Sequence, residues 1–89
     1  MTTLPLPSRS GSLARLSGIF CEQLEFREFL SVAWRDDAPF DTPEKAASLV
    51  RRVCEVSSRA AFDQDAAAAD RFHNRIRIPY VNWQLGRPL

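Results

Sequence analysis

The chain has 89 residues, of which 45% are hydrophobic and 26% charged, a mix typical of one small globular domain that folds without disulfides or metals. Twelve basic and eleven acidic residues give a formal net charge of +1, which excludes a globally basic nucleic-acid binder and a wholly acidic mimic of DNA. No apolar run approaches the roughly 20 residues of a membrane span, and the opening MTTLPLPSRSG lacks the charged start and apolar core of a signal peptide, so we expect a cytoplasmic protein.

The N-terminal part of the sequence predicts a tail followed by two helices. Residues 1–11 carry two prolines, one glycine and several hydroxyl side chains, a composition typical of a flexible tail. Ser12 is a candidate N-cap for a helix that starts at Leu13, after which apolar residues recur at spacings of three and four. Because this apolar stripe rotates part-way along, we predict two helices, over about 12–22 and 24–34.

The clearest helix start lies in the middle of the chain, after a short loop. Thr42 is a good N-cap, Pro43 suits the first helical position, and Glu44 complements the positive end of the helix dipole. A regular apolar stripe follows, so the sequence predicts a helix over about 43–56 that ends at two consecutive serines.

The C-terminal third predicts a short helical segment over 59–62 and then a longer helix. Asp63 and Asp65 are candidate caps for that longer helix, and the alanine run behind them has high helix propensity. Pro79 should end or kink it, the aromatic residues that follow should form one more turn and pack back, and 85–89 should form a tail. The residues expected on its inner face are Ala69, Phe72 and Ile76.

No stretch alternates with a period of two, so the predicted fold class is all-α. We expect a single domain of four to five short helices that spans residues 12–84, with no internal repeat and no room for a second domain. The predicted core comprises Leu16, Phe20, Phe29, Leu30, Leu49, Val50, Val53, Phe72 and Ile76.

Residue types that carry enzyme chemistry are few. Cys21 and Cys54 lie on apolar stripes, so we expect two buried, reduced thiols, with a disulfide between two helices as the alternative. His73 is the only histidine, and the sequence contains neither a CxxC motif nor a glycine-rich phosphate loop, so it predicts no metal or other cofactor. We therefore expect a protein without enzyme activity.

Charge is distributed unevenly along the chain. The segment 22–44 holds seven acidic and two basic residues, whereas no acidic residue follows Arg71. Two solvated faces would explain this pattern, but each segment is also a candidate binding surface. The acidic segment would fill a basic groove on a protein, and the basic one would contact phosphates. The candidate residues are Glu25, Glu28, Asp36, Asp37 and Trp34 for a protein partner, and Arg71, Arg75 and Arg77 for nucleic acid.

A third pattern is the helix, turn and second segment over 42–62, which has the layout of a helix–turn–helix unit that reads DNA. Two observations weaken that interpretation: the second segment is short, and the acids Asp63 and Asp65 directly after it would repel phosphate. Helix pairs with tight turns are also common in proteins that do not bind DNA.

A pattern of helix starts and core positions over about residues 20–83 resembles small helical proteins encoded by phages and prophages of GC-rich bacteria. The resemblance implies a mobile-element setting, in which some proteins of this size act in DNA metabolism and others inhibit host defence, as anti-CRISPR proteins do. It implies no site residue, and Ala61 stands where the pattern has a glutamate, so a reciprocal capping box is absent here. The residues that carry it are Cys21-Glu22, Phe26-Arg27-Glu28-Phe29-Leu30, Thr42, Glu44, Ala46-Ala47, Val53 to Arg59, Asp63, Ala67, Arg71-Phe72, Pro79-Tyr80 and Trp83.

Together these observations predict a small binding protein of a mobile element that occupies a surface on a host protein or nucleoprotein complex. A nucleic-acid-binding accessory of phage DNA metabolism is the alternative, and a structural or self-associating helical module is a third possibility.

Overall fold

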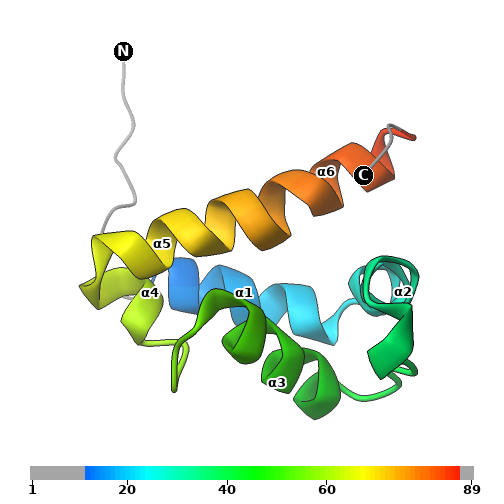
Figure 1. Ribbon diagram of the computed structural model, residues 1–89, viewed down its shortest axis with the longest axis horizontal. Helices are drawn as coiled ribbons and strands as arrows, with labels where there is room; N and C mark the ends of the chain where they lie inside the picture. The colour runs from blue at the N-terminus through cyan, green and yellow to red at the C-terminus, as the bar shows by residue number, and fades with distance from the viewer. Residues whose placement is uncertain (1–11, 87–89) are drawn as a thin grey trace.

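The computed structural model describes residues 12–86, and the regular elements in that range are all helical (Figure 1). The prediction of an all-α domain is therefore confirmed. The predicted tail over 1–11 lies outside the described residues, as do residues 87–89. The elements are α1 (Ser12–Glu22), α2 (Leu24–Ala33), the 3-10 helix η1 (Arg35–Asp37), α3 (Pro43–Cys54), α4 (Ala61–Gln64), α5 (Ala66–Phe72), the π-helical η2 (His73–Arg77) and α6 (Ile78–Gln84).

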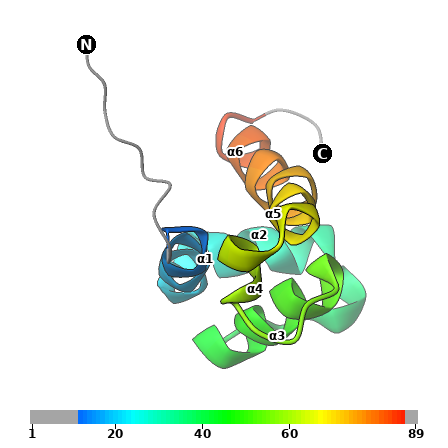
Figure 2. The same cartoon turned by 90° about the vertical axis from the view of Figure 1, so that its left-hand side faces the viewer.

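The helices form two levels, which Figures 1 and 2 show from perpendicular directions. The segment from α5 through η2 to α6, which we call the C-terminal arch, is one continuous helix that crosses the top of the molecule, with α1 and α3 beneath it. The helix α2 lies at the end of the molecule below α6, and the short α4 lies at the opposite end.

The N-terminus of α1 is held by a side chain from another helix. The backbone N–H groups of Leu13 and Ala14 donate to the two carboxylate oxygens of Asp63, at 2.8 and 3.0 Å. The first N–H groups of a helix have no partner within the helix, and a carboxylate there also complements the helix dipole. The prediction that Asp63 caps the helix following it is wrong, because Asp63 caps α1; Asp65 does cap α5, accepting from the N–H of Ala67.

The predicted start of α3 is confirmed, but its predicted end is not. The Thr42 hydroxyl accepts from the N–H of Lys45, with Pro43 at the first helical position. The helix ends at Cys54 rather than at about 56, because Glu55 adopts a left-handed conformation (φ 62°). The N–H of Val56 then closes the turn on the carbonyl of Arg51, a C-terminal motif that usually carries glycine.

The helical segment after this turn is α4, which begins two residues later than predicted. It has only four residues; its Phe62 is buried against Phe72, with ring centroids 4.9 Å apart, and its Asp63 is bound to α1. The second segment of the predicted helix–turn–helix therefore packs into the fold and offers no helix for a DNA groove.

Pro79 neither ends nor interrupts the C-terminal helix. The preceding turn widens into the π-helical η2, in which the N–H of Ile78 donates to the carbonyl of His73, five residues earlier. A proline lacks an N–H, and its ring clashes with the carbonyl four residues before it in a regular α-helix, so a wider turn accommodates it. As a result Phe72, Ile76 and Tyr80 all lie on the buried face of one continuous helix.

The core is centred on aromatic rings from α1, α2 and the C-terminal arch. The centroid of the Tyr80 ring lies 4.9 Å from that of Phe26 and 5.1 Å from that of Phe20, and both pairs meet edge-on. The Tyr80 hydroxyl donates to Gln23 Oε1 at 3.0 Å. The prediction that the aromatics after Pro79 pack back is thus confirmed. Six of the nine predicted core residues are buried, while Leu16, Phe20 and Val53 are partly buried. Ala69, predicted on the inner face of its helix, is also only partly buried, and the neighbouring Ala68 is buried instead. The buried hydrophobic residues absent from the predicted core are Cys21, Phe26, Phe40, Ala46, Cys54, Phe62, Ala68 and Tyr80.

The cap between Asp63 and α1 predicts a measurable loss when it is removed. Asp63→Ala should lower the free energy of unfolding by about 1–2 kcal/mol, because two N–H groups lose their acceptor and α1 loses its link to α4. Asp70→Ala is the matched control, since Asp70 is exposed and its replacement should cost less than about 0.5 kcal/mol. Equal urea unfolding curves for the two variants would contradict the capping role.

Candidate functional site

The acidic residues predicted to bind a partner lie on α2 and η1, at one end of the molecule (Figure 1). All four are exposed. Glu25 accepts from Gln84 Nε2 at 3.3 Å, and Asp37 forms a salt bridge of 3.4 Å with Arg52. Within residues 12–86 the side chains of Glu28 and Asp36 form no hydrogen bond or salt bridge, so their carboxylates face solvent.

Two large, exposed apolar side chains lie on α2 beside these acids, and neither was predicted as a site residue from the sequence. Leu24 is 64% exposed and Val32 is 48% exposed. Both share one line of α2 with Glu28, because residues four apart stack on a helix. Trp34 follows α2 and is only half-buried; its ring meets Phe29 edge-on with a centroid distance of 6.2 Å. The resulting surface, which we call the α2 surface, combines negative charge with exposed hydrocarbon.

The basic residues predicted to bind nucleic acid serve mainly the fold. Arg71 Nε donates to the carbonyl of Cys54 at 2.6 Å, and Arg75 Nη1 donates to the carbonyl of Val53 at 2.8 Å. Both carbonyls belong to the last turn of α3, where the helix leaves its acceptors unpaired and its dipole is negative. The two arginines therefore cap α3 from the C-terminal arch, and the interpretation of Arg71 and Arg75 as phosphate contacts is not favoured by the structure.

Arg75 also forms a 2.8 Å salt bridge with Glu55, the residue that ends α3. The hydrogen bond from Arg75 and its positive charge lower the pKa of Glu55 below its ordinary value. Arg77 is also exposed, and its only polar contact among the described residues is a long hydrogen bond of 3.4 Å to His73 Nδ1, so it alone of the three predicted arginines contacts neither a carbonyl nor a carboxylate there.

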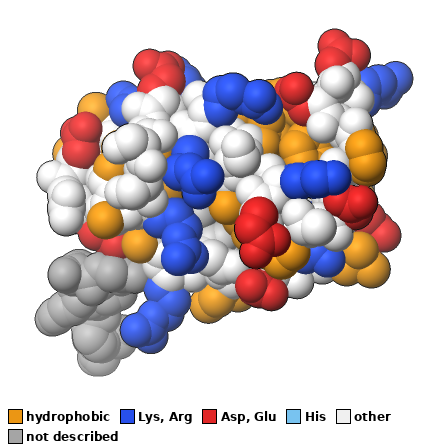
Figure 3. All heavy atoms as spheres, turned by 90° about the horizontal axis from the view of Figure 1, so that it is seen from below, with side chains coloured by type: hydrophobic (Ala, Val, Ile, Leu, Met, Phe, Trp, Pro, Cys, Tyr) orange, Lys and Arg blue, Asp and Glu red, His pale blue; other side chains and the backbone are white. Residues whose placement is uncertain are grey.

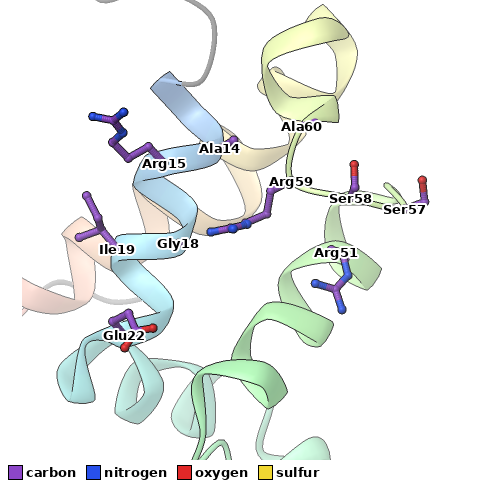
Figure 4. Close-up of a pocket in the computed structure, with 10 residues that line it drawn as sticks. All are labelled: Ala14, Arg15, Gly18, Ile19, Glu22, Arg51, Ser57, Ser58, Arg59 and Ala60. Carbon is purple, nitrogen blue, oxygen red and sulfur yellow. The ribbon is translucent and has the colours of Figure 1, made fainter.

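A groove that the sequence analysis did not predict lies between α1, α3 and the loop after α3 (Figure 4). Its volume is about 780 Å³, and its charged lining residues are Arg15, Arg51, Arg59 and Glu22. Arg59 reaches from the loop across to α1, Arg51 projects from α3, and Glu22 lies toward the far end. We call this feature the arginine groove. A smaller cavity of about 200 Å³ continues it past Gly18 and Glu22 toward Pro43 and Glu44.

Gly18 makes the position of Arg59 possible. A Cβ built on Gly18 would overlap the Nη1 atom of Arg59, so the guanidinium occupies the space that a side chain would fill. Glycine inside a helix costs roughly 0.5–1 kcal/mol relative to alanine. A glycine in the middle of α1 is thus the one sequence signal that could have pointed to this groove.

Both cysteines are buried and free. Burial raises the pKa of Cys21 and of Cys54 to about 11 each, although neighbouring arginines act in the opposite direction. At neutral pH both thiols are protonated, the form that is a poor nucleophile. Among residues 12–86 no group of three or more metal-ligating side chains comes together, and no helix there is long and apolar enough to cross a membrane.

Comparison of the chain with protein-family models, curated proteins and solved structures finds no match. The surfaces described above are therefore the basis for assigning a function.

Replacing Arg71 tests whether its role is structural. Arg71→Ala should lower the free energy of unfolding by about 1–3 kcal/mol, because the part-buried carbonyl of Cys54 loses a charge-assisted hydrogen bond. Arg77→Ala removes the same charge from an exposed position and should cost less than about 0.5 kcal/mol. Chemical unfolding of both variants decides the matter, and a stable Arg71→Ala protein would return Arg71 to the candidates for ligand binding.

Gly18→Ala should stabilise the protein by about 0.5–1 kcal/mol, since alanine favours the helix and the exposed Arg59 side chain is free to swing away. A shift in the midpoint of urea unfolding measures this effect. Destabilisation of similar size would show instead that the contact between Arg59 and Gly18 contributes to the fold.

Proposed function

We propose that this protein is a non-enzymatic binding protein that occupies a surface on a larger bacterial protein or nucleoprotein complex through its α2 surface. The observation that carries the proposal is the line of Leu24, Glu28 and Val32 along α2, which places exposed hydrocarbon beside unpaired negative charge. Mixed surfaces of this kind fit a protein partner with a basic, partly apolar groove, because the apolar groups supply burial and the charges supply orientation.

The alternative, nucleic-acid binding through the C-terminal arginines, has less support. Arg71 and Arg75 are engaged with the end of α3, so among the three candidate residues only Arg77 does not contact α3. The setting in a mobile genetic element and the inhibition of a host defence rest on the resemblance of the sequence, whereas the cytoplasmic location rests on its hydropathy; all three belong to the proposal.

The proposal is tested by capturing the partner and then varying the α2 surface. Tagged protein is incubated with nuclease-treated bacterial lysate, and one captured complex is purified for binding measurements. Glu28→Lys should weaken binding to that complex by about tenfold or more, because a charge pair that is buried in an interface contributes roughly 2–5 kcal/mol when one partner is removed.

Asp70→Lys is the matched control, since it reverses an exposed acid on α5, away from the α2 surface. It should leave binding within about twofold, and thermal unfolding should show that both variants are folded. Capture that occurs only from lysate without nuclease treatment, or equal losses for the two variants, would contradict the assignment of the α2 surface.

A further inference from the structure

We propose that the arginine groove binds the backbone phosphates of a double-stranded nucleic acid. This site is separate from the α2 surface, and the inference does not depend on the function proposed for that surface. It also differs from the basic segment that the sequence suggested, because it is built from α1, α3 and the loop between α3 and α4.

The charge in the groove is positive and available. Arg51 and Arg59 line it against the single acid Glu22, and Arg15 lies at its rim on α1 with its guanidinium directed away from Arg59 (Figure 4). Among residues 12–86 none of the three arginines forms a salt bridge or a side-chain hydrogen bond. In this they differ from Arg71 and Arg75, whose donors are engaged with α3. The face of the molecule seen from below gathers several basic side chains, with acidic side chains beside them (Figure 3).

Arg51 and Arg59 belong to one cluster. Both guanidiniums lie close enough to Cys21 to affect its pKa. Burial raises the pKa of Cys21, and the positive charges of Arg59 and then Arg51 are the largest influences that lower it. Both residues line the main groove and also its smaller extension. Neither arginine forms a salt bridge with Glu22 or Glu44, which line the same cavities, so the two like charges repel each other and a bound anion relieves that repulsion.

The groove favours a polymer of phosphates over a single small anion. It is open to solvent, where an individual ion pair contributes only about 0–1 kcal/mol. A polyphosphate backbone meets several arginines at once and releases its condensed counterions, which supplies affinity that a lone phosphate lacks. Arginine also presents a planar fork of donors that matches phosphate oxygens. Ser57 and Ser58 add hydroxyl groups at the edge of the groove formed by the loop after α3.

The lining favours a duplex over a single strand. Proteins that bind single strands stack bases on aromatic side chains, and no aromatic residue lines the arginine groove. A duplex hides its bases and presents its backbone, so charge and hydroxyl groups are sufficient to bind it. Glu22 and, in the extension, Glu44 mark the end of the groove at which a phosphate backbone would be repelled. The contact is therefore short, about three phosphates.

The test uses the full chain and a fluorescein-labelled DNA duplex of about 20 base pairs, with binding measured by fluorescence anisotropy. At about 50 mM salt the protein should bind, and log affinity should fall against log salt with a slope of roughly −2 to −3, as expected for about three phosphate contacts. Arg51→Gln combined with Arg59→Gln should weaken binding about tenfold or more and reduce the slope by about two.

The matched control is Arg35→Gln combined with Lys45→Gln, which removes the same charge from two exposed residues outside the groove. It should change affinity less than about threefold, and circular dichroism melting should show both double variants folded. Two further probes distinguish other ligands: inorganic phosphate at millimolar concentration and a polyglutamate peptide should each fail to displace the duplex.

Three results would overturn the proposal. The first is no binding of the duplex at low salt. The second is an equal loss of affinity in the groove variant and in its control, which would indicate attraction by net charge alone. The third is displacement of the duplex by polyglutamate at a similar charge concentration, which would assign the groove to an acidic protein segment instead.

Discussion

The fold depends on capping the ends of α1 and α3 with side chains from elsewhere in the chain. These helices have 11 and 12 residues, a length at which an isolated helix is marginal in water. Asp63 holds the start of α1, while Arg27 Nη1 donates to the carbonyl of Cys21 near its end, at 2.9 Å. The α3 helix begins on Thr42 and ends on the arginines of the C-terminal arch. The caps from Asp63, Arg71 and Arg75 join segments that the aromatic core must also bring together, so hydrogen bonding and burial favour the same arrangement.

The range of each interaction along the chain explains what the sequence could predict. Thr42 and Asp65 cap the helix that directly follows them, and local side-chain preference is enough to identify such caps. Asp63 reaches back 50 residues to Leu13, and no local pattern specifies that choice. Tyr80 is absent from the predicted core for a related reason: Pro79 predicts a helix end, whereas the π-helical turn before it lets the helix continue through Tyr80.

The arginines divide into two groups that the sequence does not separate. Arg27, Arg71 and Arg75 donate to backbone carbonyls, a role in which a rigid fork of donors is more effective than the single ammonium of lysine. Arg51 and Arg59 face a groove, and their guanidiniums meet no carboxylate among the described residues. The residue type is the same in both groups; the distinction follows from which arginines lie across from a helix C-terminus. Sequence spacing therefore does not show which arginines are held by the fold and which remain unpaired among the described residues.

The two proposed surfaces explain how a chain with a net charge of +1 can carry strong local charge. A basic segment beside an acidic one would be neutralised within the fold, as happens where Arg52 meets Asp37. Glu28 and Asp36 escape this pairing because they face outward from α2 and η1, and Arg59 escapes it because Gly18 lets its guanidinium lie against α1. A nucleoprotein complex offers basic protein and acidic backbone side by side, and contacts of both kinds with one such target would reinforce each other through effective concentration. Glycine at position 18 lowers the stability of α1, and its lack of a side chain leaves room for the Arg59 guanidinium in the groove. The proposed role of that charge would explain why the destabilising glycine is kept.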